Sequence, residues 1–306
     1  MAGPQVFAKG EPKDPVAGRR GAGFPPATKA VGGARGQSSP LIDRGVIPIL
    51  DRSRSRLRIP REILPEALRQ ASREGLASPL ATVRMETGGI IADGRLDPIV
   101  AAMLNVIAEA SLMLTIEVEL EGDASETTIW ATPARAVITS SLDPELVDVS
   151  PVRLPRLPET LTDVIMLRPP DAVADHPVTV AAGAYRRAEE ARHEPEAARE
   201  ALGETGLGHG DTDLLLTLLA PSTRRWTVAS TWATETGRET AQLTGFDAGA
   251  RGQWLLEVGV DADGDESSLT FAPQGDGDTL RALRDVLPRR WVGTPLNPRP
   301  VKTARR

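Results

Sequence analysis

The chain of 306 residues contains no cysteine. A disulfide framework, a thiolate metal site and a cysteine nucleophile are therefore excluded. Histidine is also scarce, because the chain has only His176, His193 and His209, and no two of them have the close spacing of a metal-binding pair. The sequence predicts no metal site and no cofactor.

Long apolar runs are absent too. The N-terminus has no apolar core of the signal-peptide type. The most apolar stretch, Ile99–Ile116, is interrupted by Asn105, Glu109 and Ser111, and its periodicity changes from helical to alternating. This pattern is typical of a core helix that leads into a strand, not of a membrane span. We expect a cytoplasmic protein without stable membrane insertion.

Positive charge is concentrated at the two ends of the chain. Residues 1–58 carry eleven Lys or Arg against four Asp or Glu, and residues 289–306 carry six Lys or Arg and no acid. Because the whole chain has a net charge of −6, these excesses of +7 and +6 leave −19 on residues 59–288. Nucleic-acid phosphates require clustered Lys and Arg. The acidic body therefore predicts no nucleic-acid partner.

Motifs that would indicate an enzyme are missing or incomplete. The glycine-rich segment Gly206–Gly210 lacks the preceding strand and the acidic ribose partner of a dinucleotide site. Asp261, Asp263 and Asp265 imitate the start of a calcium loop, but Glu266 occupies the position that requires glycine. No G-x-S-x-G motif occurs. We therefore predict no catalytic residue.

The same order of elements occurs twice along the chain. The first copy comprises a helix at 98–110, strands at 112–121, 126–131, 134–140 and 148–154, and a helix at 158–167. The second comprises a helix at 214–219, strands at 225–233, 239–246, 252–260 and 267–272, and a helix at 279–287. Two long copies indicate a duplicated α+β half and not a solenoid. We expect two halves related by a pseudo-two-fold axis, each an antiparallel sheet flanked by helices, with a groove or seam on that axis.

Composition sets the expected boundaries. Residues 1–56 are rich in glycine, proline and basic residues and are expected to be a disordered extension. The folded body spans 57–290, with halves at about 57–168 and 211–290. A central helical insertion, 169–210, joins them and contains two charged helices at 185–193 and 196–202. Residues 291–306 form a basic tail.

Aromatic residues make up only 3% of the chain, yet four of the five tryptophans fall on expected strands. These four are Trp130, Trp226, Trp232 and Trp254. Core packing is the usual role of such large rings, and a partner-facing anchor is the alternative. The sequence leaves both roles open.

Several stretches of the body have a family pattern: Arg73–Leu76 with Pro79-Leu80, Gly88–Leu96, Trp130–Pro133, Gln253–Val258, and Leu269–Pro273 followed by Leu280–Leu287. In these stretches residues 57–290 resemble the EspG family, cytosolic chaperones associated with type VII (ESX) secretion in actinobacteria. The resemblance implies a pseudo-two-fold α+β fold. It also implies a non-enzymatic function, binding the apolar helix tip of a secreted helical-hairpin pair (PE–PPE type) and keeping it soluble for export. The hairpin Glu121–Glu126 is shorter than the family's partner-contacting loop, and residues 1–56 have no counterpart.

A chaperone for an apolar helix tip requires an exposed apolar groove with a polar rim. We expect the partner-binding residues to be Tyr185, Leu214, Leu215, Leu218, Glu121 and Glu126. Ordinary core packing is the alternative role of the three leucines. Two other classes of function stay open: a small-molecule enzyme in the cleft between the halves, and a regulatory module that self-associates through an open sheet edge. The client's identity and the oligomeric state are also open.

Overall fold

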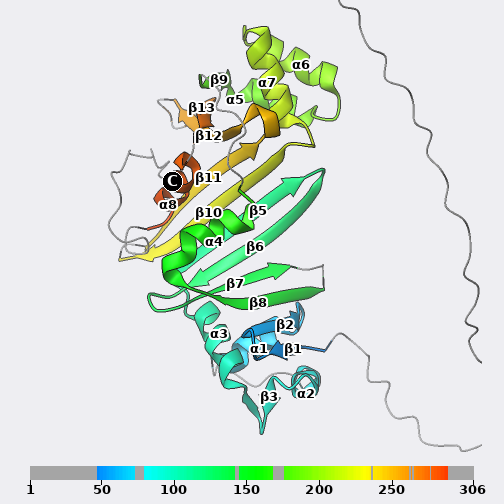
Figure 1. The fold of residues 1–306 in the computed structure, drawn as a ribbon, viewed down its shortest axis with the longest axis vertical. Helices are drawn as coiled ribbons and strands as arrows, with labels where there is room; N and C mark the ends of the chain where they lie inside the picture. Colours follow the sequence, from blue (N-terminus) through cyan, green and yellow to red (C-terminus); the bar gives the residue numbers. More distant parts are fainter. Residues whose placement is uncertain are drawn as a thin grey trace, which may run out of the picture. The chain divides into compact units, whose positions relative to one another are not determined.

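The structure is a computed structural model that describes residues 47–72, 79–141, 145–167, 176–235, 237–261, 263, 265–275 and 277–288. One antiparallel sheet of eleven strands runs through them (Figure 1). Its strands are, in order across the sheet, β1 (Ile49–Asp51), β2 (Arg56–Pro60), β8 (Leu146–Val152), β7 (Ala136–Ser141), β6 (Asp123–Ala131), β5 (Leu112–Leu120), β10 (Arg224–Thr234), β11 (Gly237–Asp247), β12 (Gln253–Val260), β13 (Glu266–Gln274) and β9 (Val178–Ala181). A separate small hairpin consists of β3 (Ile91–Ala92) and β4 (Arg95–Leu96).

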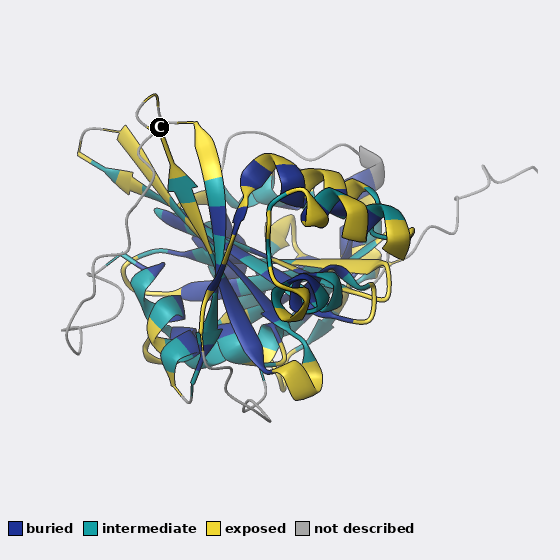
Figure 2. Ribbon diagram, turned by 90° about the horizontal axis from the view of Figure 1, so that it is seen from above, coloured by how far each residue is buried: buried dark blue, intermediate teal, exposed yellow. Residues whose placement is uncertain are grey.

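The helices cover the two faces of the sheet differently. They are α1 (Leu64–Ala71), α2 (Pro79–Thr87), α3 (Pro98–Ala108), α4 (Leu157–Val164), α5 (Ala182–Glu190), α6 (Pro195–Gly203), α7 (His209–Leu219) and α8 (Asp278–Asp285), with short 3-10 turns at Leu154–Arg156 and Gly249–Arg251. Helices α4 and α8 contact each other and pack with the central strands in one hydrophobic core. On the opposite face, α1–α3 build a second core at one end of the sheet and α5–α7 a third at the other. Figure 2 shows buried residues along the middle of the strands and exposed ones at strand ends and on the outer turns of the helices.

The central strands alternate as the sequence predicts. On β5 the buried residues are Leu112, Leu114, Ile116 and Val118, and the residues between them are half-buried or exposed. Trp226 and Val228 of β10 join them in the core under α4 and α8. Trp254 is also buried, and Trp130 and Trp232 pack against core residues. The structure therefore gives these four tryptophans a core role, which their sequence positions left open.

The two predicted copies meet in a single sheet. Outward from the centre, β5–β6–β7–β8 lie on one side and β10–β11–β12–β13 on the other, each set preceded by one helix and followed by another. We expected two halves, each with its own sheet, and a groove or seam between them. The two halves share one sheet and meet at a seam, because Leu112–Glu119 of β5 pair directly with Arg225–Trp232 of β10. This pairing satisfies backbone groups that two separate sheet edges would leave open. A two-fold relation between the halves stays a prediction.

Strand pairing also changes the expected boundaries. Strand β1 lies inside the segment 1–56 that was expected to be disordered, and it pairs with β2. The central insertion contains the two expected helices, as α5 and α6, but it also supplies the edge strand β9 next to β13. Short strands such as these carry little periodicity, and the partner of β9 also lies far away in the chain. The extension up to residue 46, residues 73–76 and the tail 291–306 lie outside the described residues.

The Asp97-Pro98 start of α3 leads to a pH-dependent prediction. The Asp97 carboxylate accepts the backbone N–H of Ile99 (2.9 Å) and a hydrogen bond from Arg52 (2.8 Å), and the bond from Arg52 is the main cause that lowers the pKa of Asp97. A lowered pKa stabilises the fold above the unfolded value near 3.8, and this contribution is lost as the pH falls through the folded value. We expect Asp97→Ala to lower the free energy of unfolding by about 1 kcal/mol at pH 7. Urea unfolding at pH 7 and at pH 3 checks this, because the difference from the native protein should shrink at pH 3.

Candidate functional site

The four apolar residues expected in a partner groove are buried. Leu214, Leu215 and Leu218 of α7 and Tyr185 of α5 are at most 7% exposed and belong to the core at the β9–β13 end of the sheet. The Tyr185 ring lies 5.1 Å from the ring of Phe271, centroid to centroid. Helix α7 packs against α6 and within the core at this end of the sheet, so its leucines are enclosed on more than one side. These side chains are core residues in the free protein, which corrects the expectation of an exposed groove there.

The two expected glutamates are exposed on the β5–β6 hairpin. Glu121 and Gly122 form its two-residue turn, with φ of 56° and 87°, as type I′ turns require. The backbone N–H of Glu121 donates to the carbonyl of Pro221 (2.8 Å), which fixes the hairpin tip beside the connection between α7 and β10. Leu120, at the same tip, is 42% exposed. The structure therefore brings this hairpin close to the end of α7, as the candidate site requires.

The face of the sheet opposite α4 and α8 is open over its central strands. Helix α3 contacts β6, β7 and β8, and α5 contacts β9 and β13, so β5 and β10 between them keep half-buried or exposed side chains. We call this surface the open face and define it by residues that alternate with the core residues: Thr115, Glu117 and Glu119 of β5, Glu126 and Thr128 of β6, Arg225, Thr227 and Thr231 of β10, and Gln242 of β11. It is a polar surface between two groups of helices.

Two carboxylates lie side by side in the middle of the open face. Glu117 and Glu126 are directly opposite each other in the β5–β6 register, and both are exposed. Within the described part of the chain, neither forms an ion pair. Like charges in directly opposite positions destabilise a sheet. The pair therefore makes the centre of the open face acidic.

Ion pairs neutralise the edge of the open face next to α5. Glu119 pairs with Arg192 at 2.9 Å, and Glu189 pairs with Arg225, which also lies 5.7 Å from the centroid of the Phe246 ring. Burial raises the pKa of the Tyr185 phenol far above its usual value, and its hydroxyl has no hydrogen-bond partner among the described residues. The phenol therefore stays neutral. The acids and bases at this edge pair with one another.

The other motifs take structural roles. Gly208 is the residue before α7, so the glycine-rich segment is the start of a helix. The Asp261 carboxylate accepts the backbone N–H groups of Asp263 and Asp265, both at 3.0 Å, and forms a turn. The Nε2 atom of His176 lies 3.1 Å from the Oδ1 atom of Asp211. Over the described ranges no group of three or more His, Asp or Glu could hold a metal ion.

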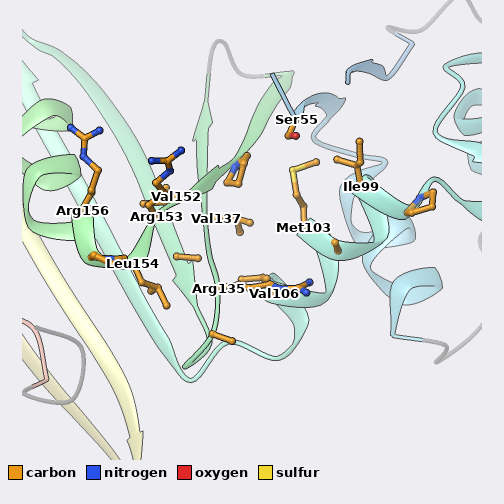
Figure 3. Close-up of a pocket in the computed structure, with 16 residues that line it drawn as sticks. Ser55, Ile99, Met103, Val106, Arg135, Val137, Val152, Arg153, Leu154 and Arg156 are labelled. Carbon is orange, nitrogen blue, oxygen red and sulfur yellow. The ribbon is translucent and has the colours of Figure 1, made fainter. Parts of the chain in front are cut away.

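An apolar pocket of about 980 Å³ lies between α3 and the adjacent ends of β7 and β8 (Figure 3). Its apolar walls include Ile99, Met103 and Val106 of α3, and Val137, Val152 and Leu154 across from them. Three arginines, Arg135, Arg153 and Arg156, also line it, and no acidic residue does. The pocket shares no residue with the open face.

Sequence reasoning missed this pocket entirely. Its residues come from Ser55, from α3, and from the segments 134–137 and 151–156, which only the fold brings together. One signal was available, since Arg153 and Arg156 form a local basic cluster in a strongly acidic body.

Within the described residues no helix is long and apolar enough to cross a membrane.

Comparison with known proteins identifies the family. None of the curated proteins matches this chain. Among solved structures, the chain is similar to the Mycobacterium tuberculosis type VII secretion system chaperone EspG5, solved in complex with the PE25–PPE41 dimer. The TM-score is 0.56 at 14% sequence identity, and the match covers 76% of this chain and 97% of that one. The EspG family model matches residues 50–285, which is most of the chain. The chain therefore belongs to the EspG family.

Proposed function

We propose that this protein is a cytosolic, non-enzymatic chaperone for a type VII secretion substrate. It binds the helical tip of a PE–PPE-like pair, the client, and keeps it soluble for export. The observation that carries this proposal is the family match over residues 50–285. The similar EspG5 fold, solved with a PE25–PPE41 dimer bound, supports it.

The open face and the β5–β6 hairpin tip are the surface we propose for the client. A helical-hairpin tip contains the start of a helix, where backbone N–H groups lack partners and the helix dipole is positive. Such an end is complementary to a pair of carboxylates. Glu117 and Glu126 are that pair, and Glu121 lies at the end of the same hairpin. Polar contacts in the centre of the open face fit a helix end better than a flat apolar surface would.

The helices on either side explain why this surface fits a narrow partner. Helix α3 lies over β6–β8 and α5 over β13 and β9, leaving the central strands between them uncovered. Two ion pairs fix the α5 side of this surface. Glu189 of α5 pairs with Arg225 of β10, and Arg192, just after α5, pairs with Glu119 of β5. A rigid opening of this kind binds a compact helical tip with little loss of side-chain freedom.

The two other classes of function have less support. An enzyme between the halves would need a cleft there, and the β5–β10 pairing replaces that cleft with a hydrogen-bonded sheet. Self-association through sheet edges would use β1 and β9, whose lengths are three and four residues. Strands this short offer few backbone groups to a second copy. We therefore propose a monomer that binds its client one to one.

Co-expression tests the function directly. The full chain is produced with and without a PE–PPE pair encoded in the same genome, and soluble material is analysed by size-exclusion chromatography with light scattering. We expect the pair to be soluble only with the chaperone, in a complex with one copy of each protein. If the pair is equally soluble alone and elutes separately from this protein, the chaperone proposal is wrong.

A further inference from the structure

The apolar pocket beside α3 has the properties of a ligand site. Its volume of about 980 Å³ lies near the upper end of the range that small-molecule sites occupy. Most of its lining is apolar, and small side chains such as Ala102, Ala134 and Ala136 leave it open. A few polar groups in an apolar concave site usually fix the orientation of a ligand. Here those groups are three arginines.

The charge of the pocket is opposite to that of the protein around it. Residues 59–288 carry a net charge of −19, yet no acidic residue lines the pocket. Arg135, Arg153 and Arg156 form no ion pair with any described residue, whereas most other arginines of the described body do. Arginine binds carboxylates strongly because its guanidinium group can donate two parallel hydrogen bonds.

Two of the arginines, Arg153 and Arg156, form a polar side opposite an apolar side. Figure 3 shows Arg153 and Arg156 next to each other on one side of the pocket, with Ile99 and Met103 of α3 on the other. Arg135 comes from the turn between β6 and β7 and lies near Val106. An occupant with an anionic group at one end and an apolar body would match both sides.

The terminal segments of this chain do not match. Residues 289–306 carry six Lys or Arg and no acid, and residues 1–46 carry seven Lys or Arg against three acids. Either segment would place positive charge against the three arginines. An external anion with an apolar body fits the pocket better than these segments.

We propose that this pocket binds a long-chain carboxylate, with the carboxylate on Arg153 and Arg156 and the hydrocarbon chain along Ile99, Met103 and Val106 of α3. The site is separate from the open face and does not depend on the proposed client. Burial of the hydrocarbon supplies most of the affinity, because apolar surface leaves water. The guanidinium groups supply the preference for an anion.

Isothermal titration of the full chain with dodecanoate, below its micelle concentration, tests the proposal. Dodecyltrimethylammonium has the same chain length and the opposite charge. We expect dodecanoate to bind at least about tenfold more tightly than the cation, since a hydrogen bond to a charged group contributes that much or more. Equal affinity for the two amphiphiles, or no binding of dodecanoate, would overturn the proposal.

Variants separate the pocket from general charge effects. The triple variant R135Q/R153Q/R156Q should lower the affinity for dodecanoate by about tenfold or more. The matched control R95Q/R238Q/R251Q removes the same charge from exposed arginines elsewhere and should leave the affinity unchanged. Equal affinities of the two triple variants would exclude the arginine site.

A second pair of variants tests the apolar part of the pocket. Ala102→Trp fills the pocket from α3, and Ala108→Trp adds the same ring at an exposed position of the same helix. We expect only the first to abolish dodecanoate binding. Circular dichroism confirms that both variants fold, and both should still bind the client at the open face. Undiminished dodecanoate binding by a folded Ala102→Trp variant would place the ligand elsewhere and refute this site.

Discussion

The double variant E117R/E126R is expected to lose client binding, with an affinity at least about a hundredfold lower than that of the native protein. Both side chains are exposed on the open face and lie opposite each other on β5 and β6. Charge reversal would place two guanidinium groups against the positive end of the client helix, and like charges across an interface cost several kcal/mol. Isothermal titration with the purified client pair measures the loss.

The matched control is Glu239→Arg on β11. Glu239 is exposed on the same sheet but on its other face. It pairs with Trp232, which packs against the core under α4 and α8, whereas Gln242 lies on the open face. Its reversal should leave client affinity within about twofold of the native value, as expected for a charge outside the interface. Equal losses in both variants would mean that binding follows net charge and not the open face.

A variant with neutral side chains at positions 117 and 126 separates an effect on client binding from an effect on stability. E117Q/E126Q keeps the size of both side chains and removes the repulsion between them. We expect it to weaken client binding while raising the free energy of unfolding by about 0.5 kcal/mol, because like charges directly opposite destabilise a sheet. A purely structural role for the two glutamates predicts no such opposite effects.

Gly245→Ala is expected to destabilise the fold by about 3 kcal/mol, the upper part of the range for overpacking a core. Gly245 pairs with Trp226 across β11 and β10, and a Cβ atom there would lie 2.2 Å from the indole ring. Trp226 is 2% exposed in the core under α4 and α8, so the ring has no free space to move into. Chemical denaturation at pH 7 measures the difference.

Gly259→Ala on β12 is the matched control. A Cβ atom there would lie 2.4 Å from the hydroxyl oxygen of Ser268, a small half-buried side chain whose hydroxyl can rotate away. We expect a loss of less than about 1 kcal/mol, mainly because only a surface contact changes. If the two variants are destabilised equally, the cost comes from losing glycine in a strand and not from the Trp226 contact.

The local patterns of the sequence were enough for most elements. Asp97-Pro98 marks the start of α3, and the alternation from Leu112 to Leu120 gives β5 with the correct buried side. Each pattern depends on residues that are close in the chain, where helical and strand periodicities are direct consequences of backbone geometry. The same patterns gave the repeated order of elements and the family resemblance.

The roles of single residues depended on distant contacts. Leu214, Leu215 and Leu218 lie on the leucine-rich helix α7, and a helix of this kind can present one face to a partner or be enclosed. Packing against α6 and strands of the β9–β13 end encloses it. Edge strands β1 and β9 were missed for a similar reason, since each is defined by hydrogen bonds to a partner far along the chain or by too few residues to show alternation.

The sequence by itself determined the α+β class, the order of the central elements, the acidic body and the absence of cysteine chemistry. Only the tertiary structure decided that the halves share one sheet, that Glu117 and Glu126 face each other on an open surface, and that three arginines line an apolar pocket. The physical reason is the range of the interactions. Periodicity and capping act within a few residues, whereas strand register and pocket walls join segments that the sequence keeps far apart.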